Sequence, residues 1–344
     1  MELLYIGSLS GTSLQRREAL RRIGHSVTAI DPETFLPRNR VAAKIHYETG
    51  GLLLAEHIRV QILRELETVM TRFDVVWVDN GRYVGSELVR SLQKQFGPVV
   101  LYNVDDPYGR RDRFSFELVR RTLPEYDLVV VVRTPNIAEA KALGARRVMH
   151  QFRCADEVAH APRSLSADDQ MRFDSEVLFV GTCFPERAPF MSALKDLGVP
   201  LTIRGNQWDR SREWNQLKDN WASAVDNPCD YSLAIQCAKI NLGMVSKGNR
   251  DLHTTRSMEI PYMGGLLCAE RTEDHTELYV EGREAVFWSD ATECATICRE
   301  LLANDEKRSE IARNGQIRAL KNANTNEALG RRILDALVPF SAGG

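Results

Sequence analysis

The stretch Leu128-Val129-Val130-Val131-Val132 is the longest continuously apolar run in the sequence. It is far shorter than the roughly 18 residues that a membrane-spanning helix needs. Its β-branched composition favours a strand. The run does not alternate between apolar and polar residues, which is typical of a parallel strand covered by helices on both faces. It therefore predicts a buried strand inside an α/β domain.

Similar short apolar runs precede and follow this one throughout the first half of the chain. They predict strands over residues 3–6, 27–30, 75–79, 99–103 and 147–150. Between them, helices are expected over residues 12–23, 52–73, 86–95, 114–122 and 137–143. This strand–helix alternation is typical of a doubly wound parallel sheet.

The second half repeats the alternation. Strands are expected over residues 177–181, 201–204, 240–244, 265–269 and 285–288, and helices over 185–197, 231–238, 256–263, 276–280, 292–303 and 305–322. Residues 155–172 are rich in Ala, Ser, Asp and Pro and are expected to form a domain linker. The predicted organisation is a Rossmann-like domain over 1–160, a second over 173–325, and a C-terminal helix and tail over 326–344. Two such α/β domains would face a central cleft.

Length and composition agree with this organisation and exclude several other classes. The chain has 344 residues, of which 43% are hydrophobic and 27% charged, so two globular domains are expected rather than a disordered or fibrous protein. With 45 basic and 47 acidic residues, a nucleic-acid partner is not expected. No apolar run could span a membrane, and no basic segment precedes the first one, so a cytoplasmic protein without a signal peptide is expected.

The seven cysteines contain no Cys-x-x-Cys pair, so no metal site is expected. Cys294 and Cys298 are one helical turn apart and are interpreted as two small side chains on one helix face. A reducing compartment fits this usage.

A small-residue loop, Gly7-Ser8-Leu9-Ser10-Gly11-Thr12-Ser13, follows the first expected strand. Its G-x-x-x-G spacing is neither the dinucleotide fingerprint nor a P-loop. Gly7 and Gly11 would let a ligand approach amides at a helix N-terminus. The alternative is a tight turn in which Thr12 or Ser13 is the N-cap.

Residues 247–265 (KGNRDLHTTRSMEIPYMGG) contain the largest group of candidate binding residues and directly follow the expected strand over 240–244. Thr254 or Thr255 is expected to cap a short helix whose N-terminal amides would face a phosphate. Three cations surround that point and could neutralise a diphosphate: Lys247, Arg250 and Arg256. This segment therefore predicts a nucleotide diphosphate site.

The same segment supplies two carboxylates and a histidine. Glu259 could accept hydrogen bonds from both hydroxyls of a ribose, or could be an exposed helix residue. Asp251 lies just before the helix, where a loop or cap role is the alternative. His253 could donate to the phosphate or to a sugar, or could make a structural cap contact.

Residues 256–267 (RSMEIPYMGGLL) resemble the R-[ST]-F-E-I-P-A-x-G-G-x-L signature of CgeB-type, spore maturation protein-like glycosyltransferases. Residues 281–288 (EGREAVFW) are similar to the family's E-G-K-E-A-V-F-F, and Asp105-Asp106-Pro107 to its D-D-P. The match is close over 240–337 and looser over 177–205. The resemblance implies a GT-B fold, with the acceptor on the first domain and the nucleotide-sugar on the second.

The resemblance also implies residue roles. Retaining GT-B enzymes share an E-x7-E pair, and Asp251 and Glu259 have that spacing with Asp in the first place. Asp251 would then hold the donor sugar and Glu259 the ribose. Arg187, at the start of a helix, would reach the diphosphate, or it is a surface charge. Arg204 and the nearby Trp208 would contact the base, unless Trp208 packs in the core.

In the first domain, Asp105 or Asp106 would orient the acceptor hydroxyl or act as its base; Asx turns ahead of the proline are the alternative. A basic cluster follows, which would meet an acidic or lipid-phosphate acceptor at a membrane surface, or is a solvated helix face. Its members are Arg110, Arg111, Arg113, Arg120 and Arg121.

Together these features predict transfer of a sugar from a nucleotide-sugar to an acceptor hydroxyl. Metal independence is expected because the sequence has no Asp-x-Asp motif, and retention is implied by the E-x7-E resemblance. A UDP-sugar is the leading donor, with GDP- and dTDP-sugars as alternatives. The acceptor would be a glycan, a lipid-linked sugar, a small molecule or a protein. The competing hypotheses are a non-catalytic nucleotide-sugar-binding or scaffold protein and another sugar-nucleotide enzyme such as an epimerase.

Overall fold

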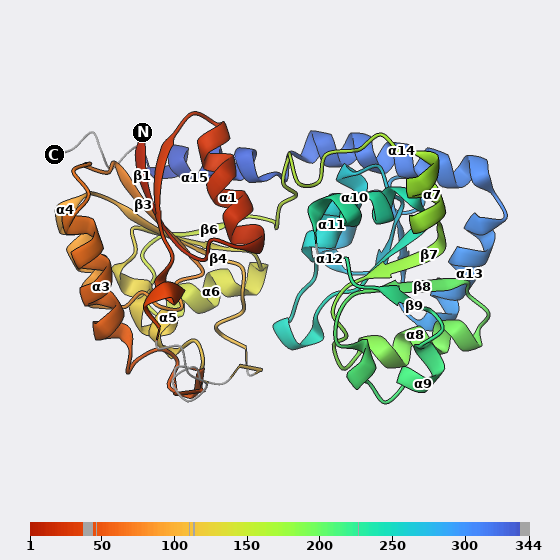
Figure 1. Cartoon of the computed structure of the whole chain (residues 1–344), viewed down its shortest axis with the longest axis horizontal. Helices are drawn as coiled ribbons and strands as arrows, with labels where there is room; N and C mark the ends of the chain where they lie inside the picture. Colours follow the sequence, from red (N-terminus) through yellow and green to blue (C-terminus); the bar gives the residue numbers. More distant parts are fainter. Residues whose placement is uncertain (37–43, 46, 110, 113, 226, 338–344) are drawn as a thin grey trace. The chain divides into compact units, whose positions relative to one another are not determined.

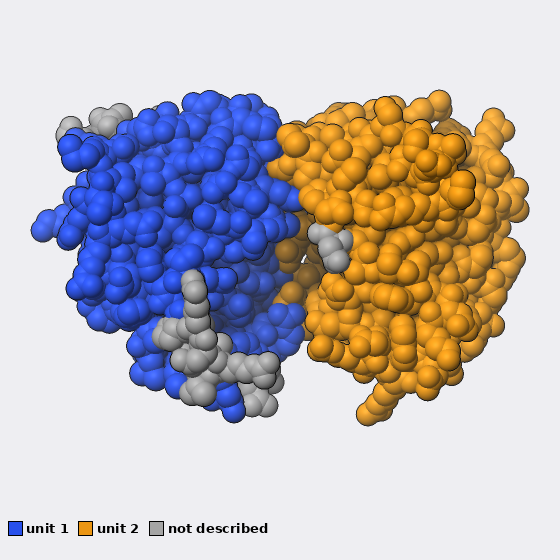
Figure 2. Space-filling model, in the orientation of Figure 1, with its two compact units in different colours: residues 1–152, 326–344 blue, residues 153–325 orange. Residues whose placement is uncertain are grey.

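The computed structural model describes residues 1–36, 44–45, 47–109, 111–112, 114–225 and 227–337. The chain forms two compact units (Figure 2). Unit 1 comprises Met1–Phe152 together with Asn326–Gly344, and unit 2 comprises Arg153–Thr325. The expected division put its first boundary at residue 160 and its second domain at 173. In the structure, the segment interpreted as a linker belongs to unit 2.

Unit 1 is built on a parallel six-stranded sheet in the order β2-β1-β3-β4-β5-β6 (Figure 1). Its strands are β1 (Glu2–Ile6), β2 (Ser26–Ile30), β3 (Val75–Asp79), β4 (Val99–Asn103), β5 (Leu128–Val131) and β6 (Val148–His150). Its helices include α1 (Gly11–Arg22), α3 (Ala55–Glu67), α4 (Ser86–Gln95), α5 (Glu117–Thr122), α6 (Thr134–Ala142) and α15 (Asn326–Leu337). Every residue of β3, β4 and β5 is buried, as expected for strands covered on both faces.

The C-terminal helix α15 returns from the end of unit 2 to pack in unit 1 against α1. Gly330 allows the close approach, because a Cβ atom there would lie 3.0 Å from Leu20 Cδ2. The side chain of Arg22 also binds that of Glu327 at 2.8 Å. The helix expected within residues 326–344 is therefore part of the first unit's fold.

Unit 2 repeats the architecture with a parallel sheet in the order β12-β11-β10-β7-β8-β9. Its strands are β7 (Ser175–Val180), β8 (Leu201–Arg204), β9 (Trp221–Ser223), β10 (Ala238–Gly243), β11 (Leu267–Glu270) and β12 (Val286–Trp288). Its helices include α7 (Ala167–Phe173), α8 (Arg187–Asp196), α9 (Trp214–Leu217), α10 (Pro228–Cys237), α11 (Thr255–Tyr262), α12 (Glu273–Leu278), α13 (Ala291–Leu302) and α14 (Asp305–Asn322).

Both sheets carry helices on their two sides (Figure 1), so the predicted fold class of two Rossmann-like α/β domains is confirmed. Among the residues described, no helix is long and apolar enough to cross a bilayer. In unit 2 the ends of β7 and β8 lie close together at Gly181 and Gly205. A Cβ atom at Gly205 would lie 2.2 Å from the carbonyl oxygen of Gly181, and Gly205 has φ = +134°. Only glycine suits such a contact and dihedral, and the loops that leave these strand ends form one wall of the candidate site.

Candidate functional site

Unit 2 contains a cavity of about 200 Å3 at the carboxyl ends of β7 and β10. This is where ligands bind in open α/β sheets, because the strand order reverses between these neighbours. Its polar lining includes Arg153, Arg187, Asp251, Thr254, Thr255 and Arg256. Five of these six are residues that the sequence analysis singled out; Arg153 is the exception.

The N-terminus of α11 forms one side of the cavity. Thr254 is its N-cap residue, as expected, and its backbone N–H donates to Ser257 Oγ at 3.0 Å. The first amides of an α-helix have no intrahelical acceptor. Since Thr255 and Arg256 line the cavity, their amides and the positive end of the helix dipole are placed to meet an anion.

Arg187 is the first residue of α8 and is only 8% exposed. Its Nη1 atom donates to the carbonyl oxygen of Thr182 at 2.8 Å, and Nε has no hydrogen-bond partner among the residues that the structure describes. Burial, reinforced by the positive charge of Arg256, lowers the pKa of Arg187 to about 10. The cavity lining therefore includes a buried cation to which no carboxylate of the described part of the chain is bonded, an environment that favours an anion.

Asp251 is buried, and its Oδ1 atom accepts a hydrogen bond from Arg153 Nη2 at 3.2 Å. The two side chains are 5% and 13% exposed, so this ion pair is largely shielded from solvent. Sequence reasoning missed Arg153 because it lies at the junction between the units, outside any recognisable motif. Its only signal is its position shortly after the β6 strand.

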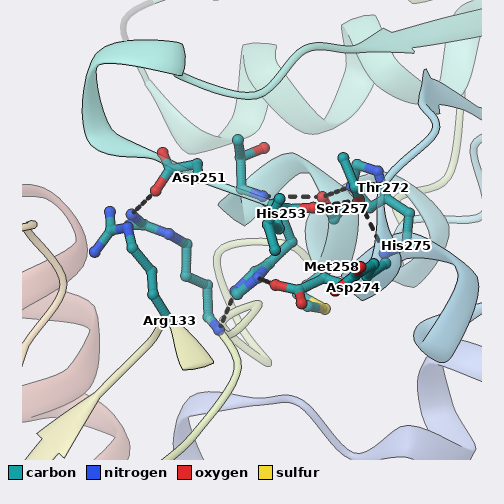
Figure 3. Close-up of polar contacts among 12 residues, drawn as sticks. Arg133, Asp251, His253, Ser257, Met258, Thr272, Asp274 and His275 are labelled. Carbon is teal, nitrogen blue, oxygen red and sulfur yellow. Dashed lines mark hydrogen bonds and ion pairs between the residues drawn. The ribbon is translucent and has the colours of Figure 1, made fainter. Parts of the chain in front are cut away.

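His253 is 2% exposed and has both ring nitrogens engaged. Nδ1 lies 2.6 Å from Asp274 Oδ2, and Nε2 accepts from the backbone N–H of Arg153 at 3.1 Å. Figure 3 shows the His253–Asp274 contact beside a second one, between Ser257 Oγ and His275 Nε2 at 2.7 Å. An imidazole that accepts through Nε2 and donates through Nδ1 is neutral. Burial accordingly lowers the pKa of His253.

Glu259 lies behind the cavity wall rather than on it. Its carboxylate is 3% exposed and accepts from the Tyr231 hydroxyl at 2.7 Å. His160 Nε2 approaches its other oxygen at 3.5 Å, and Arg256 Nη1 lies 4.0 Å away. Glu259 is thus not the exposed helix residue of the alternative interpretation. Its role in binding the ribose stays a prediction. In that role, the ribose would reach Glu259 beside Arg256.

Three other predicted residues lie outside this cavity. Lys247 is exposed and pairs with Glu270 through its ammonium group, and Arg250 is exposed with φ = +53°. Arg204 binds Ser223 Oγ at 2.5 Å and the carbonyl oxygen of Arg172 at 3.2 Å. Their predicted roles would require movement on ligand binding.

Trp208 follows the packing interpretation. It is 1% exposed, its Nε1 donates to the carbonyl oxygen of Gly181 at 2.9 Å, and its ring packs edge-on against Phe179. It is therefore not available to stack on a base.

Gly7 and Gly11 belong to a separate cavity of about 310 Å3 in unit 1. Arg16 and Asp79 line its base in a buried ion pair, with Arg16 Nε 2.7 Å from Asp79 Oδ2. The alternative of a Thr12 or Ser13 N-cap is wrong: α1 begins at Gly11 and its N-cap is Ser10, whose hydroxyl makes no capping bond. The predicted glycine loop therefore lines a cavity, but not the one that holds Arg187.

Asp105 and Asp106 lie after β4 in unit 1, as expected. Asp106 is 3% exposed and accepts from the backbone N–H of Tyr108 at 3.3 Å, an Asx-type contact, and from Asn136 Nδ2 at 3.2 Å. Asp105 is partly exposed and accepts from Asn80 Nδ2 at 2.8 Å. Of the two, Asp105 is the more accessible to an acceptor.

The basic cluster is partly described. Arg110 and Arg113 lie outside the described residues. Arg111 pairs with Asp112, and Arg120 and Arg121 both pair with Glu117. The three described arginines thus have acidic partners on their own surface.

Comparison with known proteins bears on what this arrangement does. Residues 187–335, which include α8 and α11, match the family model of glycosyl transferase-like proteins. No curated protein sequence matches the chain. A sucrose-phosphate synthase from Thermosynechococcus elongatus superimposes with a TM-score of 0.73 at 11% identity, covering 100% of both chains. The chain has the GT-B glycosyltransferase fold.

Two further solved structures share this fold. Anabaena Alr3699/HepE in complex with UDP-glucose has a TM-score of 0.67 at 12% identity and covers 98% of this chain and 100% of its own. A putative UDP-N-acetylglucosamine 2-epimerase from Listeria monocytogenes has a TM-score of 0.59 at 11% identity, over 97% of this chain and 94% of its own. The expected fold is confirmed, whereas the CgeB-type subfamily stays a prediction.

Proposed function

We propose that the protein is a glycosyltransferase that moves a sugar from a UDP-sugar to an acceptor hydroxyl, with retention at the anomeric carbon and without a metal. The observation that carries the proposal is Arg187, a buried cation that lines one cavity together with the N-terminus of α11. Such an arrangement fits a diphosphate, which carries adjacent negative charges.

The reaction breaks the bond between the sugar and the diphosphate through an oxocarbenium-like transition state. Negative charge grows on the leaving phosphate as this bond lengthens. Arg187, Arg256 and the α11 amides would stabilise that charge from fixed positions, the role that a metal ion has in other transferases. Removing one such preorganised donor typically costs about 3–4 kcal/mol in the transition state.

The carboxylates would position the donor. Asp251 lines the cavity, held by Arg153, and would accept hydrogen bonds from the donor sugar. Glu259, in the second turn of α11, would accept from the ribose hydroxyls. This Asp-x7-Glu spacing supports a retaining outcome by its similarity to the E-x7-E pair. The UDP assignment rests on HepE, whose structure contains UDP-glucose.

The acceptor would enter through unit 1. The cavity lined by Gly7 and Gly11 would receive it, and Asp105 is bonded to Asn80, a residue of the cavity lining.

Calorimetric titration of UDP, GDP, dTDP and CMP tests the nucleotide, with Arg187→Ala as the site variant. Arg299→Ala, an exposed arginine on α13, is the matched control. We expect UDP to bind best, with affinity at least about tenfold lower in Arg187→Ala, because a charged hydrogen bond contributes about 1.5–3 kcal/mol. Equal affinity in wild type, Arg187→Ala and Arg299→Ala would overturn the site.

Turnover then separates the enzyme from its competitors. UDP release from UDP-sugars, followed by NMR of the anomeric proton in the product, distinguishes transfer, hydrolysis and epimerisation. Retained configuration in a transfer or hydrolysis product supports the proposal. UDP binding without release of UDP, or with change at C2 of the sugar alone, would support the binding-protein or epimerase hypothesis instead.

A further inference from the structure

Three cysteine side chains meet in the core of unit 2, away from the cavity. Cys268 lies on strand β11, and Cys294 and Cys298 lie one turn apart on α13. Their three Sγ atoms all lie within 4.8 Å of one another. Among the residues that the structure describes, no other group of three or more His, Cys, Asp or Glu side chains converges in this way.

We infer that these three sulfurs form a binding site for a thiophilic divalent cation of the Zn2+ and Cd2+ class. Zinc–sulfur bonds are about 2.3 Å long, so three sulfurs at tetrahedral angles around one ion lie about 3.8 Å apart. The separations in the structure exceed this by at most about 1 Å, so side-chain rotation suffices to close the site. Soft sulfur ligands select such ions over Mg2+ and Ca2+.

The surroundings set the charge that the site can carry. The three residues are 0–1% exposed and pack among apolar neighbours such as Val286 and Leu301. A net charge there would be costly. Cysteine binds such an ion as a thiolate, so the divalent cation offsets two of the three ligand charges and the site keeps one negative charge. Binding therefore releases three protons, and both elements become linked through the ion.

Simple packing explains this cluster less well. A thiol packs like any small apolar side chain, so the core does not need sulfur at three adjoining positions. The other four cysteines are dispersed: Cys229 is exposed, Cys183 and Cys237 are partly exposed, and Cys154 is buried elsewhere. The sequence alone does not predict the site, because Cys268 is remote from the helical pair and the three side chains meet only where α13 packs on the sheet.

The test is Cd2+ titration of the reduced, folded protein, with the thiolate-to-metal charge-transfer absorbance and the released protons as readouts. A Cys229→Ser background removes the exposed thiol. We expect one Cd2+ per chain, release of three protons, displacement by Zn2+, and a rise in melting temperature. Cys294→Ala and Cys298→Ala should each abolish the band, and Cys154→Ala should leave it unchanged.

Several results would overturn the site. These are no band in the folded protein, a band that appears only after unfolding, or a band that survives in both α13 variants. If either variant fails to fold, X-ray absorption of the Cd2+-loaded Cys229→Ser protein decides the matter. A first shell of three sulfurs supports the site, and a shell of oxygen or nitrogen contradicts it.

Discussion

The backbone N–H of Arg153 donates to Nε2 of His253 at 3.1 Å, while the guanidinium of the same arginine binds Asp251 at 3.2 Å. The first residue of unit 2 thus holds two of the residues predicted to act on the donor. His253 is held from its other side by Asp274. Because both of its nitrogens are engaged and the ring is buried, this geometry favours a positioning role for His253 over proton transfer.

His253→Ala should lower the free energy of unfolding by about 2–4 kcal/mol, because it leaves the buried Asp274 carboxylate and the Arg153 N–H without their partner. Urea unfolding measures this loss. His57→Ala removes an exposed ring bonded to one carbonyl oxygen and should cost under about 0.5 kcal/mol. A similar small loss in both variants would contradict the positioning role.

A pH–rate profile separates the two roles of His253. If it only positions the loop, His253→Gln lowers kcat without removing an ionisation from the profile. Disappearance of the acidic limb in this variant would show instead that His253 transfers a proton in the reaction.

Acid should destabilise the protein through His275. Burial lowers the pKa of His275 to about 4, and the ring is 1% exposed between Glu270 O and Ser257 Oγ. In the unfolded chain a histidine has a pKa of about 6.5. Between pH 6.5 and 4 the unfolded state therefore binds a proton that the folded state does not, so stability falls by up to about 3 kcal/mol as the pH is lowered.

Unfolding in urea at intervals from pH 7.5 to pH 4 checks this, with His275→Gln as the variant. We expect its free energy of unfolding to be lower than that of wild type at pH 7.5 and to decline less steeply below pH 6.5. The buried His253 contributes in the same direction, so some slope persists. A slope identical to that of wild type would rule out His275 as the source.

Much of this fold could be predicted from the amino-acid composition of its strands. The buried strands β3, β4 and β8 have the expected bounds, because their apolar runs end at polar or glycine-containing turns. The edge strand β9 was not expected, since three residues (WAS) at an exposed edge carry no burial signal. Helix α7 begins within the segment interpreted as a linker and ends one residue beyond it. It is held by a Ser166–Asp169 capping box, and only Phe173 of its seven residues is buried.

The site was predictable where local sequence controls it. The N-cap at Thr254 and the start of α11 beside the cavity follow from the TTRS stretch. The partners of Glu259 did not follow, because Tyr231 and His160 come from other elements and are brought to it only by the sheet order. For the same reason, the charge of Lys247 suggested a ligand contact, whereas the fold pairs it with Glu270.

Replacing Arg187 by Met should raise stability while weakening UDP binding. In the free protein its guanidinium is buried without a bonded carboxylate, and burial lowers its pKa to about 10, so the charge opposes folding. We expect the free energy of unfolding to rise by about 1–3 kcal/mol, because Met fills the space without the charge. Thermal melts with and without UDP measure both effects.

In these melts, UDP at about 100 times its Kd should stabilise wild type by about 2.7 kcal/mol and Arg187→Met much less. Arg187→Lys retains a charge but not the planar fork, and should bind UDP with intermediate affinity. A less stable Arg187→Met protein that still binds UDP tightly would show that the guanidinium serves the fold rather than the ligand.

Tyr231→Phe should weaken UDP binding through Glu259. The hydroxyl donates to the Glu259 carboxylate at 2.7 Å, and the ring lies under the Arg256 guanidinium at 5.4 Å. Without the hydroxyl, the carboxylate loses its shortest hydrogen bond and is freer to turn toward Arg256. Since Arg256 lines the cavity, we expect both the ribose and the diphosphate contacts to suffer, with a loss of about 1–2 kcal/mol in UDP affinity.

The choice of ligand shows which contact carries that loss. If Glu259 binds the ribose, UDP should lose its advantage over 2′-deoxy-UDP in Tyr231→Phe and in Glu259→Gln, whereas the affinity for inorganic pyrophosphate should change little. If the effect passes through Arg256, UDP, 2′-deoxy-UDP and pyrophosphate should weaken together, and the ribose assignment would be lost. Tyr279→Phe is a suitable control, because that hydroxyl binds the Ser257 carbonyl oxygen at 2.7 Å on the same helix and has no contact with Glu259.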